Sequence, residues 1–242
     1  MDSRLEARLG GTPVATERTV APLDLEPWTV EAPIAWGQQA KHFQMVCKRL
    51  FDLVAATVLL VVAGVPMTLI AVVIKLDSRG PVFHVQERVG YGGRTFRLYK
   101  FRSMRAGADA AKAELLAKNE AEAPLFKMRH DPRRTRVGEF LRRFSLDELP
   151  QLLNVLKGEM SLVGPRPALA EEAGFPLSPA HAHRALAIPG MTGLWQVNGR
   201  SLLSFREMVA LDVEYAREWS LWLDLRILLK TAPTVIKGTG AF

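Results

Sequence analysis

Residues Leu53–Ile74, LVAATVLLVVAGVPMTLIAVVI, decide the fold, because these 22 consecutive residues carry no charge. A helix needs about 20 predominantly apolar residues to cross the hydrocarbon core of a bilayer. Helices buried in the core of a soluble protein are usually shorter and show an apolar face and a polar face. The run therefore predicts a membrane-associated protein.

The path of this segment through a membrane depends on its interior and its flanks. Gly64 and Pro66 lie near its middle, and a proline removes a backbone donor and kinks a helix. Spanning helices carry basic residues mainly on their cytoplasmic side. Here basic residues occur on both sides, at Lys41, Lys48 and Arg49 before the run and at Lys75, Arg79 and Arg88 after it. The residues alone fit a straight spanning helix and a bent re-entrant helix equally well.

Positive charge is concentrated in the middle of the chain. The 242 residues have a net charge of +7, and residues 75–143 contain 17 basic and 8 acidic side chains. The hydrophobic content of 48% is ordinary for a folded protein, and the single cysteine, Cys47, excludes an intramolecular disulfide framework. The basic segment favours phosphates, nucleic acid or an anionic membrane face as a partner.

The pattern after the apolar run predicts one hairpin and several helices. Val82–Arg88 and Thr95–Phe101 are β-rich runs around three glycines, which favours an antiparallel hairpin. Thr135 can cap a helix. Trp219 and Trp222, in a leucine-rich stretch, fit either a helix at a membrane interface or ordinary core packing. Helices are expected over residues 106–118, after Thr135, around Leu146–Leu156, and over residues 203–219 and 221–237.

Two adjacent carboxylates, Asp147 and Glu148, are the first candidates for chemistry. They open a predicted helix, where the helix dipole stabilises a carboxylate as the anion. This favours a nucleophile or a metal ligand over a general acid. A structural role is the alternative, because Ser145 to Glu148 matches a capping box. If Asp147 is the cap instead, Pro150 falls in the free first turn.

Basic side chains on the hairpin and in a rigid loop are candidates for binding an anion. Arg88, Lys100 and Arg102 lie on or beside the hairpin, and alternate residues of a strand share a face, which places Lys100 and Arg102 together. Arg166 stands between two prolines, and a preorganised guanidinium binds phosphate at little entropic cost. The alternative for each is a solvated surface charge.

A glycine-containing segment near Gln196 and Arg200 allows the backbone to approach a ligand closely. Neither a P-loop nor a complete G-x-G-x-x-G occurs, so ATP-binding and NAD-binding folds have no support.

A series of longer motifs follows in a fixed order along the chain. They are KRLFD at 48–52, GPVF at 80–83, RVG at 88–90, KFRSM at 100–104, DPR at 131–133, RRFSLDELPQL at 142–152, MSLVGPRP at 160–167, PGMTG at 189–193 and QVNGR at 196–200. In this order they resemble the bacterial sugar transferase family, the monotopic polyprenyl-phosphate phosphoglycosyl transferases of the small type. The resemblance covers about residues 45–240.

The resemblance implies a reaction. Such enzymes transfer a sugar 1-phosphate from a UDP-sugar to undecaprenyl phosphate and release UMP, which starts the synthesis of an exopolysaccharide, capsule, O-antigen or glycoprotein glycan. Asp147 would carry the phosphosugar covalently, and Glu148 would support the cofactor, Mg²⁺, with both carboxylates as ligands. The expected substrate contacts, from the resemblance and the residues together, are Lys100, Arg102, Arg166, Arg88, Gln196 and Arg200.

The resemblance also implies the arrangement at the membrane. We expect an α/β membrane-associated fold that is mostly helical, with a small β-hairpin, one re-entrant helix and interfacial amphipathic helices. The expected regions are a flexible tail (1–46), the re-entrant helix (47–76) and a catalytic domain (77–242) on the cytoplasmic face of the inner membrane. Family members often break the helix with a Ser-Pro pair, where this chain has Gly64 and Pro66.

Two other functions stay open on the sequence. A membrane-anchored basic module that binds acidic lipid or nucleic acid would not need Asp147, and an enzyme that transfers the sugar alone would release UDP. The expected partners are a phospholipid membrane, the UDP-sugar and undecaprenyl phosphate, with no nucleic acid. The identity of the sugar and the formation of a homo-oligomer are left open.

Overall fold

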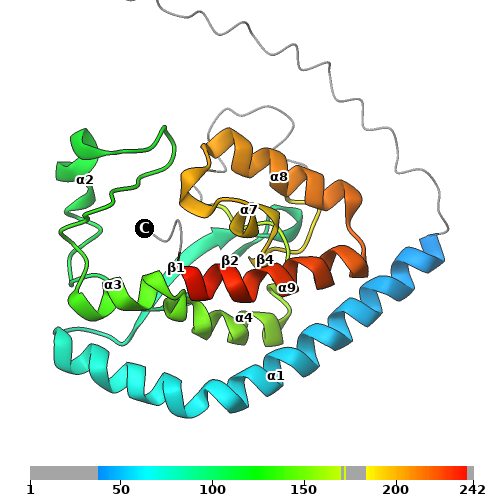
Figure 1. The fold of residues 1–242 in the computed structure, drawn as a ribbon, viewed down its shortest axis with the longest axis horizontal. Coiled ribbons are helices and arrows are strands. Elements are labelled where there is room, and N and C mark those ends of the chain that lie inside the picture. Colours follow the sequence, from blue (N-terminus) through cyan, green and yellow to red (C-terminus); the bar gives the residue numbers. More distant parts are fainter. Residues whose placement is uncertain (1–37, 170–171, 173–183, 239–242) are drawn as a thin grey trace, which may run out of the picture. The chain divides into compact units, whose positions relative to one another are not determined.

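The computed structural model describes residues 38–169, 172 and 184–238. They form one long helix, a two-stranded hairpin, a second short pair of strands and several shorter helices (Figure 1). The helices are α1 (Gln38–Asp77), α2 (Lys112–Leu115), α3 (Arg136–Arg143), α4 (Leu152–Lys157), α7 (Leu194–Val197), α8 (Phe205–Glu218) and α9 (Leu221–Lys237), with 3-10 helices η1 (Tyr91–Gly93), η2 (Leu116–Lys118), η3 (Leu146–Gln151) and η4 (Arg200–Leu202). The strands are β1 (Phe83–Val89), β2 (Thr95–Phe101), β3 (Ser161–Val163) and β4 (Gly190–Thr192).

Helix α1 contains the apolar run. It is continuous through Gly64 and Pro66, and Figure 1 shows that it curves along its length. Only 6% of its most apolar 18-residue window is buried, which is unlike a helix in a soluble core. It is the one helix among the described residues that is long and apolar enough to cross a membrane. Its start at Gln38 lies inside the predicted tail (1–46), because no proline interrupts the chain between Pro33 and Pro66.

Both ends of α1 contact the rest of the described chain. Near the start, Lys48 forms a buried ion pair with Asp224 of α9 at 2.6 Å, and the Asp52 carboxylate accepts a hydrogen bond from the Leu162 amide at 3.0 Å. Near the end, Ile74 is 2% exposed and packs in a cluster with Phe101 of β2. The middle of the helix faces outward, as shown by exposed side chains such as Val61, Val62, Val65 and Leu69.

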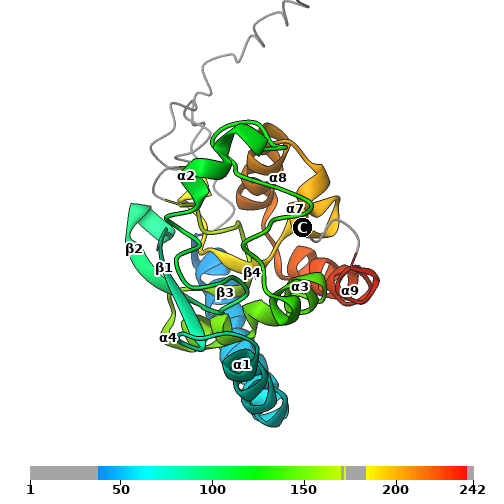
Figure 2. The same cartoon turned by 90° about the vertical axis from the view of Figure 1, so that its left-hand side faces the viewer.

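The predicted hairpin is confirmed. β1 and β2 pair antiparallel, with His84 opposite Lys100 and Gln86 opposite Leu98. Because side chains alternate across a strand, these residues and Arg88 share one face of the hairpin. Figure 2 shows β3 and β4, which are parallel, between the hairpin and α9.

At the outer edge of β2, one side chain pairs with backbone groups that a third strand would otherwise bind. The Asn154 Oδ1 atom accepts a hydrogen bond from the Tyr99 amide at 3.2 Å, and Asn154 Nδ2 donates to the Arg97 carbonyl at 2.7 Å. Asn154 is fully buried on α4, directly after η3. It therefore fixes β2, which carries Lys100, relative to η3.

Helix predictions after the hairpin are confirmed at four places and wrong in extent at one. The helix expected around Leu146–Leu156 is present as η3 followed by α4. Thr135 caps α3 by accepting a hydrogen bond from the Gly138 amide, and α8 and α9 match the two expected C-terminal helices. The helix expected over 106–118 forms only from Lys112 onward, because Gly107 takes φ +83° and the residues around it form turns beside a cavity. A short helix in such a segment is marginal without tertiary packing.

Candidate active site

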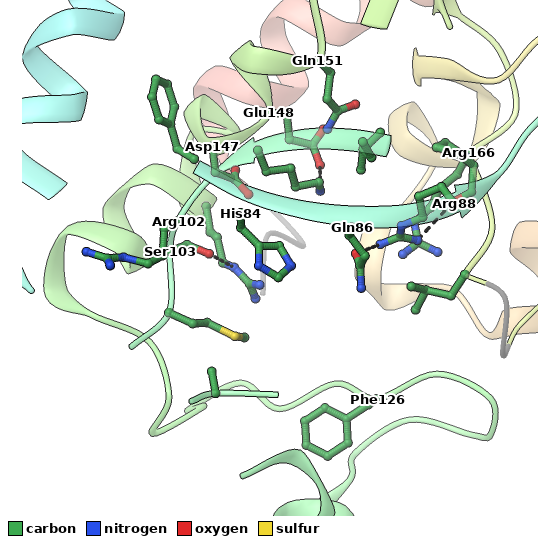
Figure 3. A pocket seen from close by; sticks show the side chains of 18 of the residues that line it. His84, Gln86, Arg88, Arg102, Ser103, Phe126, Asp147, Glu148, Gln151 and Arg166 are labelled. Atoms are coloured by element: carbon green, nitrogen blue, oxygen red, sulfur yellow. Dashed lines mark hydrogen bonds and ion pairs between the residues drawn. The ribbon is translucent and has the colours of Figure 1, made fainter. Parts of the chain in front are cut away.

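A cavity of about 640 Å³ lies beside the hairpin. One wall is the hairpin face that carries His84 and Lys100, and the opposite wall is formed by residues of the 104–127 segment (Figure 3). The 3-10 helix η3 closes the inner end and presents Asp147 and Glu148 to the cavity. The carboxylate pair predicted from the sequence thus lines this cavity.

The turn that carries the carboxylates is not the helix start predicted from the sequence. Ser145 takes a left-handed conformation (φ +54°), makes no capping bond and accepts a hydrogen bond from Arg200 Nη2 at 2.6 Å. Glu148 accepts from Lys100 Nζ at 2.7 Å, and Asp147 lies inside η3, not at a cap position. Both members of the expected capping box have other partners, so the capping interpretation is wrong.

The two carboxylates differ in their electrostatics. Burial raises the pKa of Asp147, which is 7% exposed; the charge of Lys100 opposes this shift and the charge of Glu148 adds to it. For Glu148, burial works in the same direction, but the ion pair with Lys100 holds its pKa below the ordinary value. Burial thus works against the Asp147 anion, and Asp147 lies in a short 3-10 turn instead of the α-helix from which a stabilising dipole was expected.

Lys100 connects this pair to the hairpin. Its side chain is partly exposed, 24%, and it bridges from β2 to Glu148 over 48 positions of sequence. A lysine beside two carboxylates can balance their charge or bind a phosphate oxygen.

A second group of charges lines the cavity beyond Gln86. Arg166 Nη1 contacts both carboxylate oxygens of Glu172, at 3.1 and 3.0 Å. Arg88 is 6% exposed and donates to the Pro167 carbonyl and to Gln86 Oε1, at 3.1 and 2.6 Å. Burial and the neighbouring Arg166 charge lower the pKa of Arg88 to about 9. Arg166 is thus paired with a carboxylate, whereas these hydrogen bonds of Arg88 go to neutral oxygens, and a positive charge of this kind suits a phosphate.

The guanidinium of Arg102 hydrogen-bonds to backbone carbonyls. Its guanidinium donates to the carbonyls of Ile74, Ser78 and Arg79, at 3.3, 2.6 and 2.8 Å. These carbonyls belong to the end of α1 and the turn after it, where backbone acceptors are free for a basic side chain. Arg102 thus joins the hairpin to α1, and it also lines the cavity, so its expected contact with the substrate stays a prediction.

Gln196 and Arg200 both line the cavity, as expected. Within the described residues, the buried atoms Gln196 Oε1, Arg200 Nη1 and the neighbouring Trp195 Nε1 have no hydrogen-bond partner. Buried polar atoms are normally paired, so an acceptor and two donors here suit a polar ligand.

The sequence reasoning missed several residues of the cavity walls. His84 and Gln86 could have been found, because period-two alternation puts them on the face of Arg88. Phe126, Lys127 and Trp195 carry no local signal and reach the cavity only through tertiary packing.

The chemistry of the carboxylates fits a divalent cation. Among the described residues, no group of three or more His, Cys, Asp and Glu side chains gathers. Mg²⁺ commonly takes only one or two protein carboxylates and completes its shell with water and substrate phosphates. Asp147 and Glu148, adjacent carboxylates that both line the cavity, match that donor set.

The fold and the cavity define a class of protein: a mostly helical domain with one long, exposed apolar helix, in which adjacent carboxylates face a basic cavity of a size suited to a small anionic ligand. The family model described as bacterial sugar transferase matches residues 43–238, and the chain belongs to this family.

Comparison with curated relatives gives the same family. The chain is 43% identical over 207 residues to the undecaprenyl-phosphate galactose phosphotransferase of Salmonella typhimurium, which aligns 84% of this chain with 43% of that protein. It is 41% identical over 201 residues to the exopolysaccharide production protein ExoY of Rhizobium meliloti (81% of this chain, 88% of that protein). It is 40% identical over 232 residues to the UDP-glucose:undecaprenyl-phosphate glucose-1-phosphate transferase of Caulobacter vibrioides (91% and 82%). The chain thus spans less than half the length of some relatives and most of others.

Proposed function

We propose that this protein transfers a sugar 1-phosphate from a UDP-sugar to undecaprenyl phosphate and releases UMP. The observation that carries the proposal is the Asp147–Glu148 pair with Lys100, in an arginine-lined cavity on a domain joined to an apolar helix. Family membership and the names of the relatives support it. The lipid-linked product would start the synthesis of an exopolysaccharide, capsule, O-antigen or glycan.

The proposed chemistry proceeds in two displacements. An oxygen of the Asp147 carboxylate attacks the phosphorus that bears the sugar, the bond to the UMP oxygen breaks, and UMP leaves with the electron pair. An oxygen of the lipid phosphate then attacks the same phosphorus and displaces the carboxylate. Phosphoryl transfer depends mainly on positioning and charge neutralisation, which Lys100, Arg88 and Arg166 supply in this cavity.

Asp147 and Glu148 would hold Mg²⁺ together with the diphosphate. The ion would supply positive charge to the phosphate oxygens. EDTA should abolish UMP release and added Mg²⁺ should restore it. Full activity in a metal-free assay would contradict this part of the proposal.

The membrane proposal is that α1 is re-entrant and that both its ends lie on the cytoplasmic face of the inner membrane. Its support is that residues near both ends, Lys48 and Ile74, contact the same folded part of the chain. A straight spanning helix would separate these ends across the bilayer. We place the bend at Gly64–Pro66, where proline removes a donor and the Thr68 hydroxyl donates to the Gly64 carbonyl at 2.9 Å.

Helix α9 is proposed as an interfacial helix. Trp222, Leu229 and Ile236 are 57%, 67% and 74% exposed, and Arg226 lies over the Trp222 ring. Exposed tryptophan and leucine with flanking basic groups are typical of helices in the headgroup region.

The test uses purified protein in detergent, undecaprenyl phosphate and a panel of UDP-sugars, with UMP and UDP measured separately. We expect UMP, and Asp147→Asn should lower its release by about 10³-fold or more. Asp109→Asn, on the cavity wall, is a matched control that should keep activity. Release of UDP would favour transfer of the sugar alone, and an active Asp147→Asn variant would favour a function without this nucleophile.

A further inference from the structure

The cavity wall opposite the hairpin presents one aromatic ring that the proposed chemistry does not use. Phe126 borders the cavity across from His84 and the carboxylates (Figure 3). It follows Leu125, which is buried in a cluster with Phe205 and Met208 of α8. Leu125 thus anchors the segment in the core, and Phe126 beside it lines the cavity.

The segment that carries Phe126 is held firmly. The Asn119 carboxamide donates to the carbonyls of Ala121 and Leu125, both at 2.8 Å, and accepts from the Lys127 amide at 2.9 Å. Lys127 Nζ donates to the Ser201 carbonyl of η4 at 3.1 Å. The ring is therefore presented by a loop whose backbone is fixed on both sides of it.

One face of the ring is already occupied. The Arg133 guanidinium lies over it, 4.8 Å from the centroid, and is itself fixed by Asp131 through bonds of 2.9 Å at Nε and 2.7 Å at Nη2. This cation–π contact fixes the ring orientation. Phe126 and Arg133 both line the cavity, so the ring borders it together with the guanidinium that holds it.

Other aromatic rings at the cavity are engaged in packing. Phe83 and Phe101 stack on each other with centroids 5.4 Å apart, and Trp195 packs against the α8 cluster. Among the described phenylalanine and tryptophan side chains that line the cavity, Phe126 is the one that belongs to neither the stacked pair nor a core cluster.

We infer that Phe126 is the stacking platform for the pyrimidine base of the donor nucleotide. The inference rests on the proposed function, which supplies a nucleotide with its phosphates at Asp147 and the arginines and its base away from them. Base–aromatic stacking is worth a factor of about 5 to 100 in affinity. A base on Phe126 and a diphosphate at the hairpin wall would bridge the cavity.

The test separates the base from the phosphates. Binding of UMP and of inorganic pyrophosphate to the full chain is measured in detergent with Mg²⁺, for wild type, Phe126→Leu and Phe126→Trp. Phe126→Leu keeps an apolar side chain but removes the π-face. It should weaken UMP binding about 5- to 100-fold and change pyrophosphate binding less than about twofold. Phe126→Trp keeps an aromatic ring and should bind UMP about as well as the wild type does. Phe140→Leu, on the exposed side of α3 away from the cavity, is the matched control and should bind both ligands as wild type does.

Two outcomes overturn the inference: unchanged UMP affinity in Phe126→Leu, or equal losses for UMP and pyrophosphate, which would indicate a general disturbance of the fold. The same variants are assayed for UMP release, where Phe126→Leu should raise KM for the UDP-sugar and leave kcat nearly unchanged. A wild-type protein that releases no UMP would refute the proposed function instead, so the two failures are distinguishable.

Discussion

At the scale of single residues, Asp147 and Glu148 are neighbours in sequence, but their pKa values are shifted in opposite directions. Burial raises the pKa of Asp147, whereas contact with Lys100 lowers that of Glu148 in spite of burial. Pairs of carboxylates whose pKa values are pushed apart can take different roles. Asp147 is the better nucleophile candidate once its proton is lost, and Glu148 stays anionic beside Lys100.

This difference predicts a pH profile. A carboxylate attacks only when deprotonated, so a raised Asp147 pKa makes activity fall at a higher pH than an ordinary aspartate would. Lys100→Met removes a charge that lowers this pKa, and Glu148→Gln removes one that raises it. The acid limb of kcat/KM should therefore move to higher pH in Lys100→Met and to lower pH in Glu148→Gln. Lys118→Met, outside the cavity lining, should leave the limb in place. Shifts in the same direction for both cavity variants would contradict the assignment.

At the scale of elements, α1 is attached to the catalytic part through a buried network. Lys48 of α1 donates to Asp224 of α9 and to the Val163 carbonyl of β3, and the Tyr215 hydroxyl of α8 donates to the same carboxylate at 2.7 Å. Four elements thus meet at one ion pair that is less than 10% exposed on either side.

Breaking this pair should loosen the attachment. Asp224→Asn leaves the Lys48 ammonium buried without a counter-charge, which costs about 3–5 kcal/mol, equivalent to a fall in Tm of about 6–20 °C for a chain of this size. Thermal unfolding in detergent measures it. Asp77→Asn, at the exposed end of α1, should change Tm by less than about 2 °C. Equal Tm values for Asp224→Asn and wild type would refute a stabilising role for the network.

Local signals in the sequence identified most elements, and tertiary contacts decided the rest. The charge-free run, the β-rich runs around glycines and the Thr135 cap each follow from residues close together, so α1, the hairpin and α3 were predicted. The left-handed Ser145 and the pairing of Lys100 with Glu148 depend on Arg200 and on β2, which are distant in sequence. The contacts of Ser145 and Glu148 in this turn therefore could not be predicted from the neighbouring sequence.

The same distinction holds for the site. Asp147 and Glu148 were found because their neighbourhood is a long motif, and Arg88, Arg166, Gln196 and Arg200 do line the cavity. Arg102 lines the cavity as well, but its guanidinium also donates to carbonyls at the end of α1. Only the packing of the hairpin against α1 distinguishes a residue that fixes a helix end from one that faces a ligand.

At the scale of the whole molecule, the cavity and the apolar helix belong to one folded unit, since both ends of α1 contact it. In the proposed arrangement, a lipid phosphate held at a membrane surface would reach the carboxylates without leaving the bilayer. This arrangement fits an acceptor with a long isoprenoid chain, and it requires that α1 enters and leaves the membrane on the same side.

Cysteine labelling tests that requirement. In a Cys47→Ser background, Leu50→Cys and Leu76→Cys mark the two ends of α1, and Val61→Cys marks its exposed middle. In intact right-side-out cells, an impermeant maleimide should label neither end; in inverted membranes it should label both, while Val61→Cys stays protected by lipid. Labelling of one end from each side would show that the helix spans the bilayer.

The most direct measurement for the central claim is the intact mass of the protein after incubation with a UDP-sugar and Mg²⁺ in the absence of undecaprenyl phosphate. The account predicts an added mass of one sugar phosphate, located by fragmentation on Asp147, absent from Asp147→Asn and lost when undecaprenyl phosphate is added. Normal formation of the lipid product with no adduct on Asp147, under conditions that quench the reaction within one turnover, would contradict it.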